Sequence, residues 1–300
     1  MNIVPVHFIL FFCVLATFAH ALSVAEMSAA FPVVSGETRT MITTGRETLM
    51  ELARREGFGY ENVANSNRSV DPWILRSGTK ITLPGQVIVP SGSIAGLNIN
   101  LAELRLFHII TLNDGRYKVS VYPLGIGRAG RETPEGTCYV TIKKQAPQWR
   151  VPEVLRRQDP ALPQVMSPGP QNPLGDYWVG LSKPGYGLHG TNRPFGVGRR
   201  VSNGCMRMYP EDVAVLYEQV EIDTPVRISY QPVKAAIHEN RLLLEVHPDY
   251  LGRFGDLFQQ ALTMISKTRW AGAIDYSQVR IVVSAQNSLP EVIGQRLVDQ

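Results

Sequence analysis

The stretch from Leu188 to Met208, LHGTNRPFGVGRRVSNGCMRM, places His189 sixteen residues before Cys205, with an arginine two residues beyond the cysteine. A thiol is a weak nucleophile at its free pKa near 8.5, and an adjacent imidazole can convert it into a thiolate. Gly204 allows a sharp turn before Cys205 and can aim backbone amides at a developing oxyanion. These are the parts of an acyl-transfer site.

This stretch resembles the signature of the L,D-transpeptidase (YkuD-type) catalytic domain. The resemblance rests on His189-Gly190-Thr191-Asn192 and on Ser202-x-Gly204-Cys205-x-Arg207, and the upstream segment Thr133-Pro134-Glu135-Gly136-Thr137 resembles the family's turn before a core strand. Nearly the whole chain resembles the periplasmic ErfK/YbiS subgroup. The resemblance implies a mainly β protein, with a YkuD-type β-sandwich or barrel over residues 97–230.

The resemblance also implies the chemistry of a peptidoglycan L,D-transpeptidase. Cys205 attacks the diaminopimelate carbonyl of a tetrapeptide stem, expels the terminal D-Ala and forms a thioester. His189 takes the thiol proton and later deprotonates the acceptor amine, while the Gly190 carbonyl orients its ring. The amides of Gly204 and Cys205 form the oxyanion hole.

The remaining residues of the motif are expected to contact substrate or support the turn. Arg207 can pair with a stem carboxylate through two hydrogen bonds, and Ser202 supports the turn. Thr191 and Asn192 are expected to contact substrate. Asn203 stands where many family members have histidine, so we expect altered substrate or oxyanion contacts there.

Several other functions are open or disfavoured. The six histidines show neither HExxH spacing nor a cysteine pair, so we expect no metal and no cofactor. Ser202 lacks the GxSxG context of a serine hydrolase. An L,D-carboxypeptidase that uses water as acceptor and a non-catalytic wall-binding protein remain alternatives. The acceptor is also open: the lysine amine of an outer-membrane lipoprotein, or a second diaminopimelate. We expect carbapenems to inhibit the protein.

The N-terminus indicates export. An apolar run from Ile3 to Ala19 precedes Ala19-His20-Ala21, a small-x-small cleavage pattern, so a signal peptide over residues 1–21 and a periplasmic location are expected. No lysine or arginine precedes the run, and an uncleaved anchor is the alternative.

In an oxidising compartment Cys138 and Cys205 could form a disulfide, but we expect Cys138 to be a buried thiol in the core.

Residues 39–84 predict a small βααβ module. Thr48 and Glu51 form a capping box that opens a helix over residues 49–55, a second helix holds Val63 and Ala64, and residues 81–83 return as a strand. The unit resembles a LysM module, which binds the N-acetylhexosamine backbone of peptidoglycan, and an unrelated α/β cap is the alternative. Residues 85–96 read as a linker.

The middle of the chain has the period of two that is typical of strands. A hairpin is predicted from residues 104–110 and 117–122 around Asn113-Asp114-Gly115, with further strands at 138–142 and 226–230. Residues 151–180 hold six prolines and predict a structureless lid or wrapping loop, with plain surface irregularity as the alternative. Trp149 and Trp178 are expected to be packing anchors.

Residues 233–300 predict a small α/β extension of unknown role. It contains a hairpin over residues 235–246, a helix from Leu251 to Ile265 and a last strand over residues 280–284.

Across the 300 residues, 44% apolar and 19% charged side chains exclude disorder and coiled coil. The net charge of +4 is too diffuse for a nucleic-acid partner.

Overall fold

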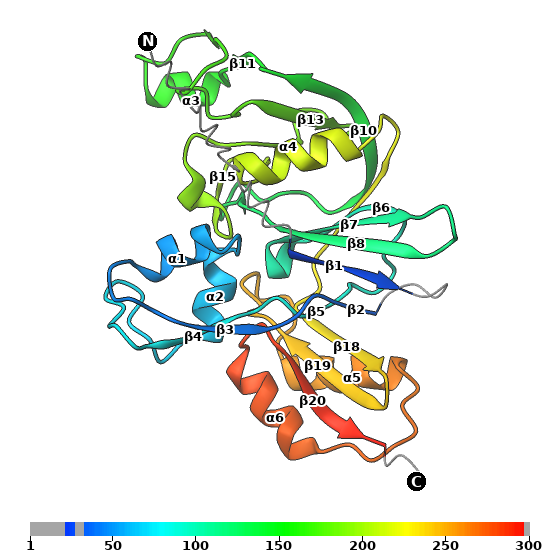
Figure 1. Cartoon of the computed structure of the whole chain (residues 1–300). Helices are drawn as coiled ribbons and strands as arrows, with labels where there is room; N and C mark the ends of the chain where they lie inside the picture. Colours follow the sequence, from blue (N-terminus) through cyan, green and yellow to red (C-terminus); the bar gives the residue numbers. More distant parts are fainter. Residues whose placement is uncertain (1–21, 28–32, 297–300) are drawn as a thin grey trace, which may run out of the picture.

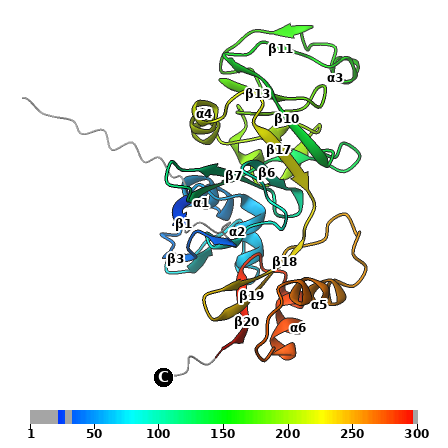
Figure 2. The same ribbon diagram turned by 90° about the vertical axis from the view of Figure 1, so that its right-hand side faces the viewer.

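The computed structural model describes residues 22–27 and 33–296, and it confirms the mainly β architecture predicted from the sequence (Figure 1). The predicted signal segment, residues 1–21, lies outside the described residues. Within the described residues, no helix combines the length and the apolar character that crossing a membrane requires. A large curled sheet and a smaller C-terminal sheet occupy opposite ends of the molecule, as both views show (Figure 2).

The large sheet forms the framework of the molecule. Its strands, counted over the described residues, follow the order β1-β8-β7-β6-β17-β10-β13-β14-β16. Neighbouring strands are antiparallel, except that β6 pairs with β17 and β14 pairs with β16 in parallel. The predicted hairpin is β7 and β8, and the predicted later strands are β10 and β17. The bounds are β1 Leu22–Met27, β6 Gly96–Asn100, β7 Arg105–Thr111, β8 Tyr117–Pro123, β10 Gly136–Gln145, β13 Tyr177–Leu181, β14 Gly187–His189, β16 Met206–Arg207 and β17 Pro225–Ser229.

An apolar core fixes the strands that end at the motif. Leu188 of β14 and Met206 of β16 are fully buried in it, together with Val213 and Leu216 of helix α4, Pro210–Gln219. Complete burial of one such side chain stabilises the fold by about 1.5–3 kcal/mol. Short elements complete this part: 3-10 helices η1 Leu101–Glu103 and η2 Pro194–Gly196, and paired strands β9 Ile126–Gly127 and β15 Arg200–Ser202.

The predicted βααβ order is confirmed over residues 39–83, which we call the βααβ unit. It consists of β3 Arg39–Ile42, α1 Leu49–Arg55, α2 Tyr60–Ser66 and β4 Lys80–Leu83. The capping box is present, since the Glu51 amide donates to Thr48 Oγ1 at 3.2 Å and the Thr48 amide donates to Glu51 Oε2 at 2.7 Å. The segment 85–96, read as a linker, contains a buried strand: β5 Val87–Ile88 pairs with β2 Val34–Ser35.

The C-terminal part, residues 233–295, places two helices on a three-stranded sheet. The predicted hairpin is confirmed as β18 Val233–His238 and β19 Arg241–Val246, and β20 Pro290–Gln295 completes the sheet. The strand predicted at residues 280–284 is wrong, because this segment lies inside α6 Tyr276–Ala285. Its β-branched residues suggested a strand, but Asp275 caps the helix and Val279 and Val282 bury one helical face.

The helix predicted from Leu251 begins later. α5 spans Leu257–Lys267, and the Asp256 side chain accepts hydrogen bonds from its first amides. Leu251 and Phe254 instead pack against the core of the large sheet. Apolar spacing alone could not show this change of partner, because the two residues face a different core from the rest of the pattern.

The proline-rich segment is more ordered than predicted. Residues 151–180 contain α3 Glu153–Gln158, and β11 Trp149–Arg150 pairs with β12 Val165–Met166 at the end of the molecule farthest from β20 (Figures 1 and 2). Pro152 directly precedes α3, where its fixed φ and missing N–H are compatible with helix initiation. The expectation of a structureless loop is therefore wrong.

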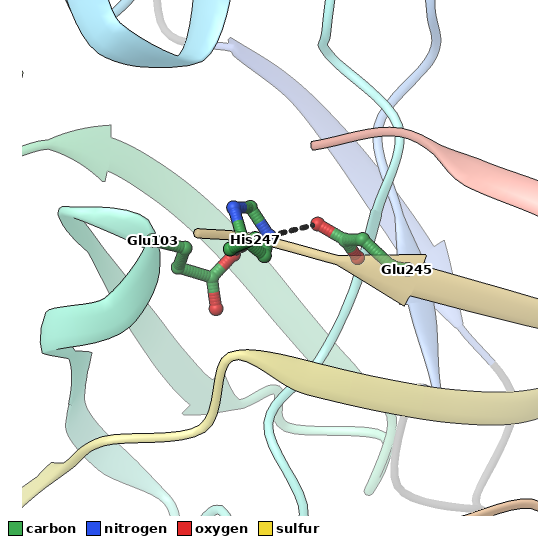
Figure 3. Close-up of side chains that lie close together, drawn as sticks. All are labelled: Glu103, Glu245 and His247. Atoms are coloured by element: carbon green, nitrogen blue, oxygen red, sulfur yellow. Dashed lines mark hydrogen bonds and ion pairs between the residues drawn. The ribbon is translucent and has the colours of Figure 1, made fainter. Parts of the chain in front are cut away.

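A buried cluster of charged side chains joins the large sheet to the C-terminal part. Lys234 Nζ lies 2.8 Å from Glu103 Oε2 and 3.1 Å from Glu245 Oε2, and Arg105 Nη1 lies 3.2–3.3 Å from the same two carboxylates. His247 Nε2 is 2.8 Å from Glu245 Oε1 (Figure 3). All five side chains are at least 95% buried. Two carboxylates thus face two cations, and the cluster is balanced in charge.

Candidate active site

The pairing of two short strands creates the site. β14 and β16 run in parallel, with His189 opposite Arg207. Cys205 immediately precedes β16 and is two residues before Arg207, and both side chains line one cavity. Residues sixteen positions apart in the sequence are in this way brought to one edge of the sheet.

His189 is fixed by its neighbours on both sides. The residue is 4% exposed, and Nδ1 of its ring lies 2.6 Å from the Gly190 carbonyl oxygen. Because a carbonyl only accepts, Nδ1 carries the proton and Nε2 is the basic nitrogen. The ring stacks on Trp178, the residue opposite it on β13, with centroids 5.7 Å apart. Burial lowers the pKa of His189 to about 4, against the raising effect of the Gly190 carbonyl.

Cys205 is a half-buried free thiol, and Cys138 is also free. The two cysteines, both among the described residues, do not form a disulfide with each other. Cys205 Sγ donates to the Gly185 carbonyl at 3.2 Å. Burial raises the pKa of the Cys205 thiol, although the Gly187 amide and the Arg207 charge lower it. The sequence suggested a thiolate held by imidazole, whereas burial favours the neutral form of both groups.

The turn before Cys205 is held by two hydroxyl groups. Ser202 Oγ accepts from the Gly204 amide at 3.0 Å and donates to the Cys205 carbonyl at 2.5 Å. Thr133 Oγ1 accepts from the Gly127 amide at 3.1 Å and donates to the Gly204 carbonyl at 2.7 Å. The Gly204 amide, predicted as an oxyanion-hole donor, thus already donates to Ser202 Oγ, and of the predicted pair only the Cys205 amide remains for that role.

Gly204 itself cannot carry a side chain without strain. Its φ is +116°, and an added Cβ would lie 2.8 Å from the Tyr186 ring. The sharp turn that the sequence suggested is therefore present, and the space beside it is closed by an aromatic ring.

A cavity of about 410 Å³ contains the thiol and the imidazole. Three cationic side chains line it, and no aspartate or glutamate does so among the described residues. Arg207 is half-buried, and its Nε has no hydrogen-bond partner within the described part of the chain. Burial lowers the pKa of Arg207, as does the charge of Arg193. The lining residues include Lys144, Trp149, Arg150, Leu155, Leu174, Trp178, Gly185, His189, Ser202, Asn203, Cys205 and Arg207.

The predicted site residues do not all meet in this cavity. Asn203 lines it, but Thr191 and Asn192 are absent from its lining. Thr191 Oγ1 instead accepts from the Arg193 amide at 2.9 Å, and Asn192 Nδ2 donates to the Gln171 carbonyl at 3.0 Å. These contacts hold the loop after His189.

Sequence reasoning missed part of the cavity wall. Trp149 and Trp178 were expected to be packing anchors, yet both line the cavity. Lys144 and Arg150 were not singled out, because they lie outside the motif on β10 and β11. Pro152 and Leu155 of the proline-rich segment line the cavity as well, and this proximity is not visible in local sequence.

Comparison with known proteins agrees with this geometry. The profile of the L,D-transpeptidase catalytic domain (YkuD) matches residues 96–228. A protein of Escherichia coli K12 named "Probable L,D-transpeptidase ErfK/SrfK" is 36% identical over 216 residues, covering 70% of this chain and 68% of that protein. Its namesake in Salmonella typhimurium is 34% identical over 258 residues, covering 81% of this chain and 82% of that protein.

This chain belongs to the L,D-transpeptidase family. A solved L,D-transpeptidase from Mycobacterium tuberculosis H37Rv shares 16% identity with it over 51% of this chain and 73% of that chain, with a TM-score of 0.33. Family membership makes the protein an acyltransferase with peptidoglycan as its substrate class. The LysM resemblance of the βααβ unit stays a prediction.

Because burial favours the neutral forms of Cys205 and His189, we expect the rate of Cys205 alkylation to have a distinctive pH profile. The rate of Cys205 alkylation by iodoacetamide, measured by mass spectrometry in a Cys138→Ser background, should still be rising above pH 8.5. The reason is that a raised thiol pKa leaves the unreactive protonated form dominant at neutral pH. No inflection is expected between pH 5 and 7, since His189 titrates near pH 4. A plateau reached below pH 7 would indicate a resting thiolate and contradict this account.

Thr133 is expected to act as a positioning residue. Thr133→Val leaves the buried Gly127 amide and Gly204 carbonyl without their hydroxyl partner, so the free energy of unfolding should fall by about 1–3 kcal/mol. The rate of Cys205 acylation should fall as well, because the turn loses a support. Thr133→Ser keeps the hydroxyl and should restore the acylation rate. Equal acylation rates in the valine and serine variants would show that the hydroxyl does not position the turn.

Proposed function

We propose that this L,D-transpeptidase uses Cys205 to transfer a stem peptide of peptidoglycan to an amine in the periplasm. The supporting observation is the cavity in which Cys205 and His189 lie with Lys144, Arg150 and Arg207. Stem peptides carry several carboxylates, and a cavity lined by three cations and no described acidic residue favours such a ligand. Arg207, whose Nε is unpartnered, is available for one carboxylate.

The reaction divides into two steps that share one base. In the first, His189 Nε2 accepts the thiol proton while Cys205 Sγ attacks the diaminopimelate carbonyl, and the proton then passes to the departing amine of D-Ala. A thioester remains. In the second, His189 takes a proton from the acceptor amine, which displaces the thiolate, and the thiol is restored.

The second part of the proposal is the group that accepts the acyl chain from Cys205. We favour a lysine amine of an outer-membrane lipoprotein or the side-chain amine of a second diaminopimelate, with water as the carboxypeptidase alternative. The solvent-facing cavity and the exposed Asn203 admit an acceptor but do not select one. A carbapenem should acylate the same thiol, since its strained amide is attacked by the same nucleophile.

Product analysis tests the proposal. Purified full-length protein is incubated with a disaccharide-tetrapeptide, with and without a lipoprotein-derived lysine peptide, and the products are identified by mass. Release of D-Ala together with a dimer or a lysine adduct supports transpeptidation. Release with a tripeptide alone supports the carboxypeptidase. An unchanged substrate, with glycan binding retained in Cys205→Ala, would leave the wall-binding alternative.

A further inference from the structure

The indole of Trp178 lies against the face of the His189 ring. The two ring centroids are 5.7 Å apart, and the planes differ by 21°. The residues are register partners on β13 and β14, and both line the cavity of Cys205. We propose that Trp178 is a positioning residue, which holds the plane of the imidazole and favours the charged form that this ring takes during proton transfer.

Two glycines leave the space in which the indole lies. Gly180 and Gly187 are opposite each other on β13 and β14. A Cβ added at Gly180 would lie 2.7 Å from Trp178 Nε1, and a Cβ added at Gly187 would lie 2.5 Å from Trp178 Cζ2. Both distances are well below the ~3.5 Å of ordinary contact. Because these two positions carry no side chain, the indole can lie flat on the strand pair that ends at His189.

The imidazole is held at one edge by the backbone and on one face by the indole. His189 Nδ1 donates to the Gly190 carbonyl at 2.6 Å, and this hydrogen bond selects the tautomer. A hydrogen bond at one edge still allows the ring to tilt, whereas a stacked aromatic ring restricts the tilt of the whole plane. The indole therefore sets the plane in which the basic nitrogen, Nε2, lies.

The stack also acts on the charge that the ring acquires. When Nε2 takes the proton of Cys205 Sγ, the imidazole becomes a cation, and both burial and the charge of Arg207 oppose that cation. Among the described residues, no aspartate or glutamate lines the cavity to balance it. The face of an indole attracts a cation within about 6 Å of its centroid, and the His189 ring lies inside this distance. Trp178 thus supplies part of the stabilisation that a carboxylate supplies in a Ser-His-Asp triad.

Acylation of Cys205 by a carbapenem tests the proposal on the full chain, with the maximal rate and the half-saturating concentration measured separately. Trp178→Leu should lower the maximal rate about tenfold or more, because a small displacement of a reacting group is costly. The half-saturating concentration should change less than about threefold, since the lost interaction acts on the chemical step. Trp178→Phe keeps an aromatic face and should recover most of the rate.

A fluorinated indole tests the effect on charge without changing the fold. Site-specific 5,7-difluorotryptophan at position 178 keeps the shape of the ring but weakens the negative potential of its face. The maximal rate should fall about two- to threefold, because the cation on His189 is then attracted less strongly. This variant also keeps the proposal testable if Trp178→Leu does not fold.

Trp270→Leu is the matched control. Trp270 of the C-terminal part also lies on two glycines, since a Cβ added at Gly272 would be 2.7 Å from its ring and a Cβ added at Gly294 would be 3.1 Å from it. Trp270 does not line the cavity of Cys205, so its replacement should leave both kinetic constants unchanged.

Three results would overturn the proposal: an undiminished maximal rate in Trp178→Leu, equally slow leucine and phenylalanine variants, or a loss confined to the half-saturating concentration. An unchanged rate with the fluorinated indole would overturn the part that concerns charge. The inference rests on the proposed role of His189 as the base, and His189→Gln separates the two. If His189→Gln is slow while Trp178→Leu is not, this inference alone fails, whereas an undiminished rate in His189→Gln would reject the base itself.

Discussion

Replacing His189 by glutamine is expected to slow acylation of Cys205 by a carbapenem about 10²–10⁴-fold, the range typical of a lost general base. Glutamine can still donate to the Gly190 carbonyl, but it cannot accept a proton from sulfur. The loss should be large because the raised pKa of the thiol leaves little thiolate to react without help. Stopped-flow or quenched mass measurements of adduct formation give the rate.

His238→Gln is the matched control for this variant. His238 ends β18 in the C-terminal sheet and does not line the cavity of Cys205, so its replacement should leave the acylation rate unchanged. An acylation rate for His189→Gln within threefold of the unsubstituted protein would mean that proton transfer to His189 does not limit the reaction. The role of His189 would then have to be abandoned.

Lys234→Met is expected to lower the free energy of unfolding by about 3–5 kcal/mol, because it leaves buried carboxylates with too few cations. Lys234 Nζ contacts both Glu103 and Glu245 and also donates to the Ile88 carbonyl at 2.6 Å. One ammonium thus joins Ile88 of β5, Glu103 of η1 and Glu245 of β19. Urea unfolding, with an unchanged slope and a lower midpoint, would measure the loss.

The comparison variant for Lys234 is Arg157→Met. Arg157 forms an ion pair with Glu153 on the surface, and such pairs contribute about 0–1 kcal/mol. A loss below 1 kcal/mol in Lys234→Met would show that the cluster does not hold the parts together.

The free energy of unfolding should also depend on pH through Glu245. Because the pKa of this carboxyl is lowered to about 2, its stabilising contribution is present above pH ~4.3 and is lost as the pH falls towards 2.

Local signals accounted for much of the fold. The capping box of Thr48 and Glu51 and the Asn113-Asp114-Gly115 turn each depend on residues within a few positions, and both elements lie where they were predicted. The error at residues 280–284 has a physical cause. A run of β-branched residues favours a strand locally, whereas burial of one helical face decides the outcome in the folded chain.

The residues of the active site also form two groups, those that the local sequence reveals and those that it does not. Cys205, His189 and Arg207 could be named because they share one segment whose parallel strand pairing brings them together. Thr133 lies 71 residues from the carbonyl that it supports, and Lys144 and Arg150 reach the cavity from other strands. The neutral state of the thiol also depends on burial, which a motif does not reveal. Such contributions come from tertiary packing.

We expect the sulfur of Cys205 to become covalently acylated. The direct measurement is intact-mass analysis after exposure to a carbapenem, followed by peptide mapping, on the unsubstituted chain, Cys205→Ser and Cys138→Ser. We expect one adduct, located on the peptide that contains Cys205, present in Cys138→Ser and absent in Cys205→Ser. An unmodified protein under conditions that acylate a control enzyme, or an adduct on Cys138, would contradict the account.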